Sequence, residues 1–108
     1  MRIEKLLRAV AVSIGLLVGG QSAGAASGSQ IYLFSQPFCP GCEAAKAYLR
    51  AHEIDYREFD ITSSDAALSA FKRLGGRGTP FFIIGGQRMH GFTVGRFEQR
   101  LKDAGIIR

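Results

Sequence analysis

The chain has 108 residues, a formal net charge of +5 and only two cysteines. This length leaves room for one small domain, because a second hydrophobic core would not fit. Acidic and basic residues are interleaved, without a basic tract or a run of basic and aromatic residues. A nucleic-acid partner is therefore not expected, and two cysteines are too few for a disulfide framework.

The first 25 residues have the pattern of a secretory signal peptide. Arg2, Lys5 and Arg8 form a basic region, residues 9–20 are uncharged and mostly apolar, and residues 23–25 provide a small-residue cleavage site. We expect cleavage after residue 25 and export to the periplasm, an oxidising compartment. An uncleaved membrane anchor is the alternative, although a membrane span needs about 20 apolar residues and this stretch is shorter.

The rest of the chain predicts a single α/β domain at residues 31–108, preceded by a Gly/Ser/Ala-rich linker at residues 26–30. In chain order we expect a buried strand at 31–34, a helix at 39–52, an alternating strand at 54–61, a helix ending at Gly75-Gly76, a hairpin of strands 81–84 and 87–90, and a last helix after Thr93. A parallel βαβ unit followed by an antiparallel hairpin forms one mixed four-stranded sheet flanked by helices.

Helix caps and core faces follow from the same patterns. Residues 62–65 contain an N-cap candidate with an acidic residue three positions on, Thr62 with Asp65, close to a capping box. The last helix is expected to be capped by Thr93. The expected core-facing residues are Ala45, Tyr48 and Leu49 on the first helix and Val94, Phe97 and Leu101 on the last. The second helix is expected to run through Ala66, Leu68, Phe71 and Leu74.

Both cysteines occur in the stretch Phe38-Cys39-Pro40-Gly41-Cys42, between a predicted strand and a predicted helix. A disulfide between residues this close in sequence gains little loop-closure entropy, so it serves better as a reversible redox couple than as a structural crosslink. Pro40 suits the first helical turn, where its missing N–H is not needed. A strand followed by Cys-x-x-Cys and a helix is typical of a thioredoxin-like redox motif.

A metal-binding module is the alternative interpretation of the two cysteines. Cys39 and Cys42, with His90 as a third ligand, would hold Cu(I) or Zn²⁺ in an exported carrier, since thiolates suit both metals. The chain has no second Cys or His pair at zinc-site spacing, so a closed four-ligand site would need two copies of the chain. The redox interpretation is preferred, and no resident metal is expected.

With these motifs in order, the chain resembles the glutaredoxin-like branch of the thioredoxin superfamily. The resemblance covers nearly all of residues 30–103 and depends on four features: the Cys-Pro-Gly-Cys motif, Thr79-Pro80 before the third strand, Gly85-Gly86 in the hairpin, and Gly91-Phe92 before the last helix. It implies a thioredoxin-like fold of the glutaredoxin type and thiol–disulfide oxidoreductase activity.

The resemblance also assigns roles to individual residues. Cys39 would be the nucleophile, which agrees with the thiolate-favouring environment of a helix N-terminus, and Cys42 would be the more buried resolving thiol. Pro80 would be the cis-proline beside the cysteines, and Thr79 would pair with an extended thiol substrate. Arg77, Gly91 and Phe92 complete the substrate-binding residues that the resemblance implies.

The expected substrates are protein disulfides or glutathione, the latter as a co-substrate rather than a bound cofactor. Arg77 occurs where glutaredoxins have an arginine, three residues before the cis-proline. Gln36 and Gly41 replace a common lysine and a common aromatic residue, and Gly91-Phe92-Thr93 is more similar to the glutaredoxin-like hydrogen donors served by thioredoxin reductase. We expect a monomer that exchanges electrons with a donor or acceptor that the sequence does not identify.

Overall fold

A computed structural model of the chain describes residues 30–108. The predicted signal peptide and residues 26–29 of the predicted linker lie outside the described residues. Gln30, the last predicted linker residue, accepts a backbone hydrogen bond of 2.9 Å from Gly85. Within residues 30–108, no helix is both long and apolar enough to span a membrane.

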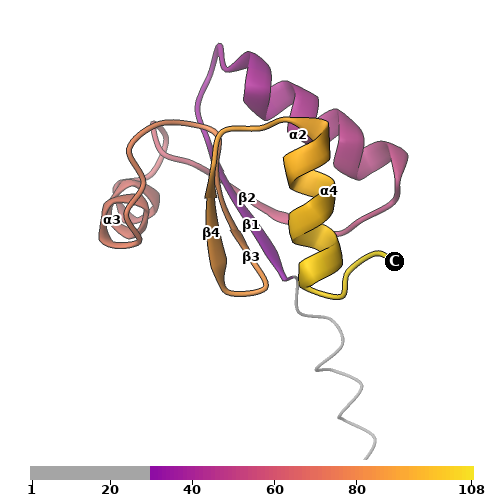
Figure 1. Cartoon of the computed structure of the whole chain (residues 1–108). Coiled ribbons are helices and arrows are strands. Elements are labelled where there is room, and N and C mark those ends of the chain that lie inside the picture. Colours follow the sequence, from indigo (N-terminus) through magenta and orange to yellow (C-terminus); the bar gives the residue numbers. More distant parts are fainter. Residues whose placement is uncertain (1–29) are drawn as a thin grey trace, which may run out of the picture.

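The domain is built on one mixed sheet of four strands in the order β2-β1-β3-β4. Strand β1 (Ile31–Ser35) runs parallel to β2 (Arg57–Asp60) and antiparallel to β3 (Phe81–Ile84), which forms a hairpin with β4 (Gln87–His90). Helices α2 (Pro40–Ala51) and α4 (Val94–Asp103) cover one face of the sheet, and α3 (Asp65–Arg73) lies against the other (Figure 1). The predicted α/β fold, with its β-α-β-α-β-β-α order, is confirmed.

The second strand is shorter than predicted. Residues 54–61 alternate between apolar and polar types, but only Arg57–Asp60 form β2. Ile54 instead donates its backbone N–H to Leu49 at the end of α2, at 2.9 Å, and packs against the core beside that helix. Ile54, the first apolar residue of the predicted strand, therefore belongs to the loop that connects α2 to β2.

The N-cap of α3 is Ser64 rather than Thr62. The Ser64 hydroxyl accepts a hydrogen bond from Ala67 N–H at 3.1 Å, which satisfies one of the free donors of the first helical turn. Thr62 is already engaged, because its N–H and hydroxyl both donate to the carboxylate of Asp60. Thr62 therefore stabilises the turn after β2, and Ser64 caps the helix that follows.

The far end of α3 also differs slightly from the prediction. Leu74 is the C-cap and is 39% exposed, so it does not contribute to the core, and Ala66 is also exposed. Gly75 has φ +93°, a conformation that glycine adopts without strain, and Gly76 N–H donates to Phe71 C=O at 2.8 Å. The predicted stop at Gly75-Gly76 is confirmed by this geometry.

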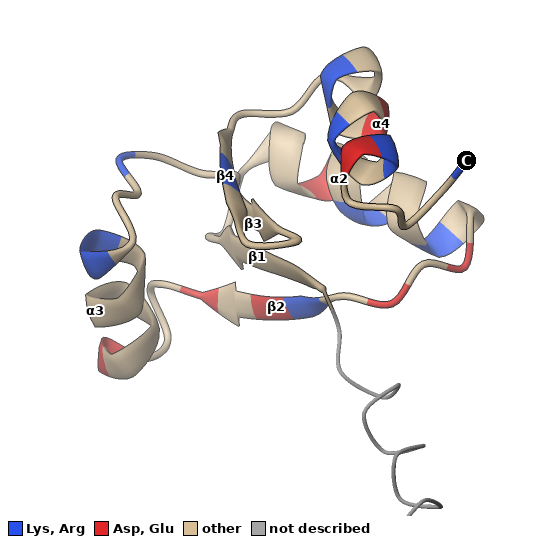
Figure 2. Ribbon diagram, turned by 60° about the horizontal axis from the view of Figure 1, so that its bottom comes forward, with Lys and Arg blue, Asp and Glu red and all other residues tan. Residues whose placement is uncertain are grey.

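Two arginines of α4 cover the outer edge of β4. The guanidinium of Arg96 donates to the carbonyl of His90 at 3.2 Å, and that of Arg100 donates to the carbonyl of Arg88 at 2.6 Å. Figure 2 shows the basic residues of α4 and β4 in blue. Edge strands leave alternate backbone groups unpaired, so these contacts satisfy two carbonyls that would otherwise be open to another strand.

The sheet separates two hydrophobic clusters. The larger one lies between the sheet and helices α2 and α4, and the smaller one lies under α3. Buried residues of the larger cluster are Ile31, Leu33, Ala45, Leu49, Phe82, Ile84, Met89, Phe97 and Leu101, and those of the smaller cluster are Phe34, Phe71 and Phe81.

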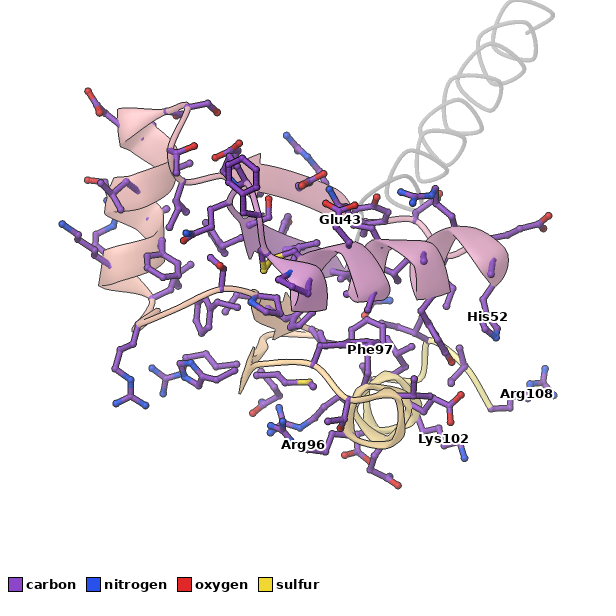
Figure 3. The ribbon with its side chains drawn as sticks, turned by 90° about the horizontal axis from the view of Figure 1, so that it is seen from above. Glu43, His52, Arg96, Phe97, Lys102 and Arg108 are labelled. Atoms are coloured by element: carbon purple, nitrogen blue, oxygen red, sulfur yellow. A yellow bond between two sulfur atoms is a disulfide. The ribbon has the colours of Figure 1, made fainter. Side chains whose placement is uncertain are left out.

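Thr93 caps α4 as predicted, but the core face of this helix does not include Val94. Phe97 is fully buried and lies between α2 and α4, with Arg96 and Lys102 on the outer side of α4 (Figure 3). The Phe97 ring meets Tyr48 edge-on at 5.5 Å and Phe82 at 5.1 Å. Val94 is the first residue of the helix and is 50% exposed.

Phe97→Ala should lower the free energy of unfolding by about 3–5 kcal/mol, the usual cost of deleting a buried aromatic ring. Val94→Ala, on the same helix, is the matched control and should change it by less than about 0.5 kcal/mol. Both values can be measured by urea denaturation of the oxidised protein. Similar losses from the two variants would contradict this assignment of the core face.

Candidate redox site

Cys39 and Cys42 form a disulfide at the N-terminal end of α2, with their Cα atoms 5.2 Å apart (Figure 3). Cys39 is the N-cap of the helix and Pro40 is its first residue, as expected from the preference of proline for that position. Cys39 is 7% exposed and Cys42 is fully buried. Cys39 is therefore the more exposed residue of the pair.

The Cys39 sulfur occupies the position in which a side-chain cap normally sits. Its Sγ accepts a hydrogen bond from Cys42 N–H at 3.2 Å, and its carbonyl accepts from the N–H groups of Cys42 and Glu43 at 3.0 and 3.1 Å. These N–H groups form the positive end of the helix dipole. When the disulfide is reduced, the same donors favour the thiolate form at Cys39.

The Thr79–Pro80 peptide bond is cis, as the family resemblance implied, and Pro80 lies against the cysteine motif. A Cβ atom added to Gly41 would be 3.0 Å from Pro80 Cδ, so the glycine allows a close approach between the two segments. Thr79 is half-buried, and none of the described residues hydrogen-bonds to its backbone. Its N–H and C=O are therefore not used by the described part of the fold.

Of the remaining predicted substrate-binding residues, Gly91 contacts Pro80 directly. Gly91, at φ +77°, donates its N–H to Pro80 C=O at 2.9 Å, which joins the end of β4 to the cis-proline. Phe92 is half-buried and packs on Phe97 with ring centroids 5.2 Å apart. Arg77 is exposed in the loop before Thr79. The binding roles of all of these residues stay predictions.

A cluster of polar side chains beside the active-site helix was not predicted from the sequence. Lys46 of α2 forms ion pairs with Glu58 of β2 at 3.0 Å and with Glu43 at 3.1 Å, and the buried Ser35 donates to Glu58 at 2.7 Å. Lys46 follows Cys42 by one helical turn. The sequence carried no local signal for it, because the register of β1 and β2 is what places Glu58 opposite Leu33 and so on the α2 face of the sheet.

These contacts change the acidity of both partners. The hydrogen bonds to Glu58 and Glu43 raise the pKa of Lys46 above 10.5. Burial acts to raise the pKa of Glu58, but hydrogen bonds from Ser35 and Lys46 outweigh it, so this pKa lies below 4.5. Both groups are therefore charged over the whole neutral range, and the pair ties the middle of α2 to the sheet.

No group of three or more Cys, His, Asp or Glu side chains within residues 30–108 is arranged to hold a metal ion. His90 stacks on Phe81 with ring centroids 4.8 Å apart, and its carbonyl is bonded to Arg96. The metal-carrier alternative, whose closed site would need two copies of the chain, stays a prediction.

Comparison with known proteins agrees with this geometry. A family profile described as Glutaredoxin matches residues 31–89, more than half of the chain. The chain belongs to the glutaredoxin family. No curated protein sequence matched it.

Solved structures share the fold of this glutaredoxin. The thioredoxin-like protein BC3987 superposes with a TM-score of 0.61 at 30% sequence identity, covering 66% of this chain and 99% of that protein. NrdH-redoxin from Escherichia coli gives a TM-score of 0.57 at 22% identity, with coverage of 64% and 91%. The glutaredoxin–glutathione complex from buckwheat gives 0.55 at 19% identity, with coverage of 73% and 82%.

Glu58→Gln should lower the free energy of unfolding at pH 7 by up to about 1 kcal/mol. Because the pKa of Glu58 is lowered by folding, its contribution is complete above about pH 4.5 and is lost as the pH falls through the native pKa. Because folding raises the pKa of Lys46, the contribution of Lys46 to stability is complete below about pH 10.5 and is lost as the pH rises through the native pKa. Urea denaturation of oxidised protein from pH 3 to 7 measures the acidic limb.

Glu43→Gln is the control for this variant, because Glu43 also pairs with Lys46 but its side chain is 67% exposed. It should cost no more than about 0.3–0.5 kcal/mol. A stability–pH curve for Glu58→Gln that parallels the wild-type curve below pH 5 would contradict the assignment.

Proposed function

We propose that this glutaredoxin is an exported thiol–disulfide oxidoreductase that acts on protein or glutathione disulfides through Cys39 and Cys42. The observation that carries the proposal is the Cys39–Cys42 disulfide at the start of α2, in which Cys39 is slightly exposed and Cys42 is fully buried, with the cis-proline Pro80 packed against Gly41 between them. This arrangement provides an attacking thiolate, a resolving thiol and an open backbone segment within one small site.

In the reductive direction, the Cys39 thiolate attacks one sulfur of a substrate disulfide. The substrate S–S bond breaks, the first substrate thiolate leaves and takes up a proton, and a mixed disulfide joins Cys39 to the other half. Cys42 then loses its proton and attacks the Cys39 sulfur, which releases the second substrate thiol. Two electrons have moved to the substrate, and the protein is left with the Cys39–Cys42 disulfide seen in the structure.

The cycle closes when an electron donor reduces this disulfide by the reverse sequence of exchanges. An acceptor would instead reoxidise the pair if the protein oxidises other thiols. Cys39 is the entry point in both directions because Cys42 is fully buried. The N–H donors at the start of α2 stabilise Cys39 as the leaving group as well as the attacking group.

Two features support glutathione as a co-substrate. Arg77 is exposed three residues before Pro80, where a guanidinium can pair with a carboxylate of the tripeptide. The structurally similar buckwheat glutaredoxin has been solved as a complex with glutathione. We propose that the tripeptide pairs with the open backbone of Thr79 while its sulfur faces Cys39.

Cys39→Ser should abolish disulfide reduction, because no thiolate remains at the accessible position. Cys42→Ser should still attack the substrate but should accumulate the mixed disulfide, which non-reducing mass spectrometry detects as an adduct of the substrate mass. The double variant Cys39→Ser/Cys42→Ser is the control and should form no adduct. Undiminished turnover by Cys42→Ser on a protein disulfide would contradict the two-cysteine cycle.

The export proposal depends on residues 1–25, whose composition is that of a signal peptide. In a Gram-negative host, the full chain should appear in the periplasmic fraction with Ala26 as its first residue, as determined by N-terminal sequencing. Ala25→Arg, which removes the small residue at the cleavage site, should block processing. Wild-type protein that keeps Met1 and sediments with membranes would support the anchor instead.

A further inference from the structure

Phe38, the residue before the nucleophile, is the most exposed large hydrophobic residue in the described part of the chain. Its side chain is 101% exposed, against 50% for Val94. A large apolar side chain normally loses exposed area when the chain folds, since its burial is favourable. Here the fold leaves the whole ring in contact with water, directly beside Cys39.

The backbone of Phe38 is also unusual. Its φ is +60°, in the left-handed region that bulky aromatic residues rarely adopt. Glycine or asparagine would adopt this conformation at a lower free-energy cost. Such outliers occur mainly at functional sites, where the surrounding structure holds them. The combination of an unfavourable backbone conformation and full exposure is not explained by packing within the domain.

Phe38 belongs to an apolar collar on both sides of Cys39, which we define as Pro37, Phe38 and Pro40. All three residues are exposed. Residues 31–42 contain no charged side chain, and the first charge on α2 is that of Glu43. Figure 2 accordingly shows the start of α2 in tan. The collar therefore offers apolar contact area and no charge to a molecule that approaches the Cys39 sulfur.

We propose that the collar, with Phe38 as its main contact, selects protein disulfides whose cysteine is flanked by apolar residues. This inference rests on the proposed function and names its substrate class. Cys39 is only 7% exposed, so a substrate sulfur must approach closely and bring its neighbouring residues onto the collar. Apolar neighbours then cover the Phe38 ring and remove apolar area from water.

Glutathione disulfide gains little from the same surface. It carries ammonium and carboxylate groups and no large apolar side chain, while the collar carries no charge to pair with them. Its recognition depends on the Thr79 backbone and Arg77, which the collar does not include. Removal of the Phe38 ring should therefore separate the two substrate classes.

The test uses reduced full-length mature protein and single-turnover oxidation, followed by acid quenching and thiol alkylation. Three disulfides serve as probes: a pentapeptide disulfide with leucine on both sides of each cysteine, the same peptide with serine in place of leucine, and glutathione disulfide. Wild type should react about tenfold faster with the leucine peptide than with the serine peptide, the factor expected when roughly half of a phenylalanine ring is buried.

Phe38→Asn is the informative variant, because asparagine tolerates the left-handed backbone conformation and so keeps the loop in place. It should lose the tenfold preference for the leucine peptide and keep its rate with glutathione disulfide within about twofold. Phe38→Tyr should retain the preference. Val94→Asn, which removes an exposed apolar residue from the first turn of α4, should change none of the three rates.

The possible outcomes separate the two proposals. A wild-type protein that oxidises with none of the three disulfides would overturn the proposed function itself. Wild-type activity with an unchanged leucine-to-serine ratio in Phe38→Asn would overturn the collar alone. Sedimentation velocity of the wild type and of Phe38→Asn tests one more outcome. If the wild type is a dimer and Phe38→Asn is a monomer, Phe38 forms a contact between two copies of the chain, and the collar proposal is overturned.

Discussion

The N-terminus of α2 is both the start of a helix and the location of the reactive sulfur. Cys39 caps the helix through its own Sγ and carbonyl, and the N–H of Cys42, in the first turn, is directed at the sulfur that reacts. A shift of this helix would therefore also move the reactive sulfur of Cys39. Much of the domain serves to hold α2 in place.

Three contacts provide that support. Phe97 and Tyr48 join α2 to α4, the Lys46–Glu58 ion pair joins it to β2, and Gly41 lets the Pro80 ring approach the cysteine motif. The antiparallel pairing of β1 with β3 sets Phe34 opposite Phe81. The last residues of β1 and the first residues of β3 therefore lie at the same end of the sheet. Cys39 and Pro80 come together there for that reason.

The collar gives this site a second property, which is independent of its redox chemistry. Reactivity comes from backbone groups at a helix end, whereas the uncharged collar consists of the side chains of Pro37, Phe38 and Pro40. The two can change separately. A site of this kind can keep one exchange mechanism while its preference among disulfides is set by a few exposed residues.

The sequence by itself determined the redox motif, the α/β class, the hairpin and the N-cap of α4, because each depends on residues close together in the chain. Local pattern also led to errors: Val94 fits an apolar helix period but is exposed at the first turn of α4, and Thr62 is occupied by Asp60. Only the tertiary structure decided the Lys46–Glu58 pair, the Gly41–Pro80 contact and the full exposure of Phe38. These depend on strand register and on which surfaces the packed elements leave uncovered, and neither is a property of a local segment.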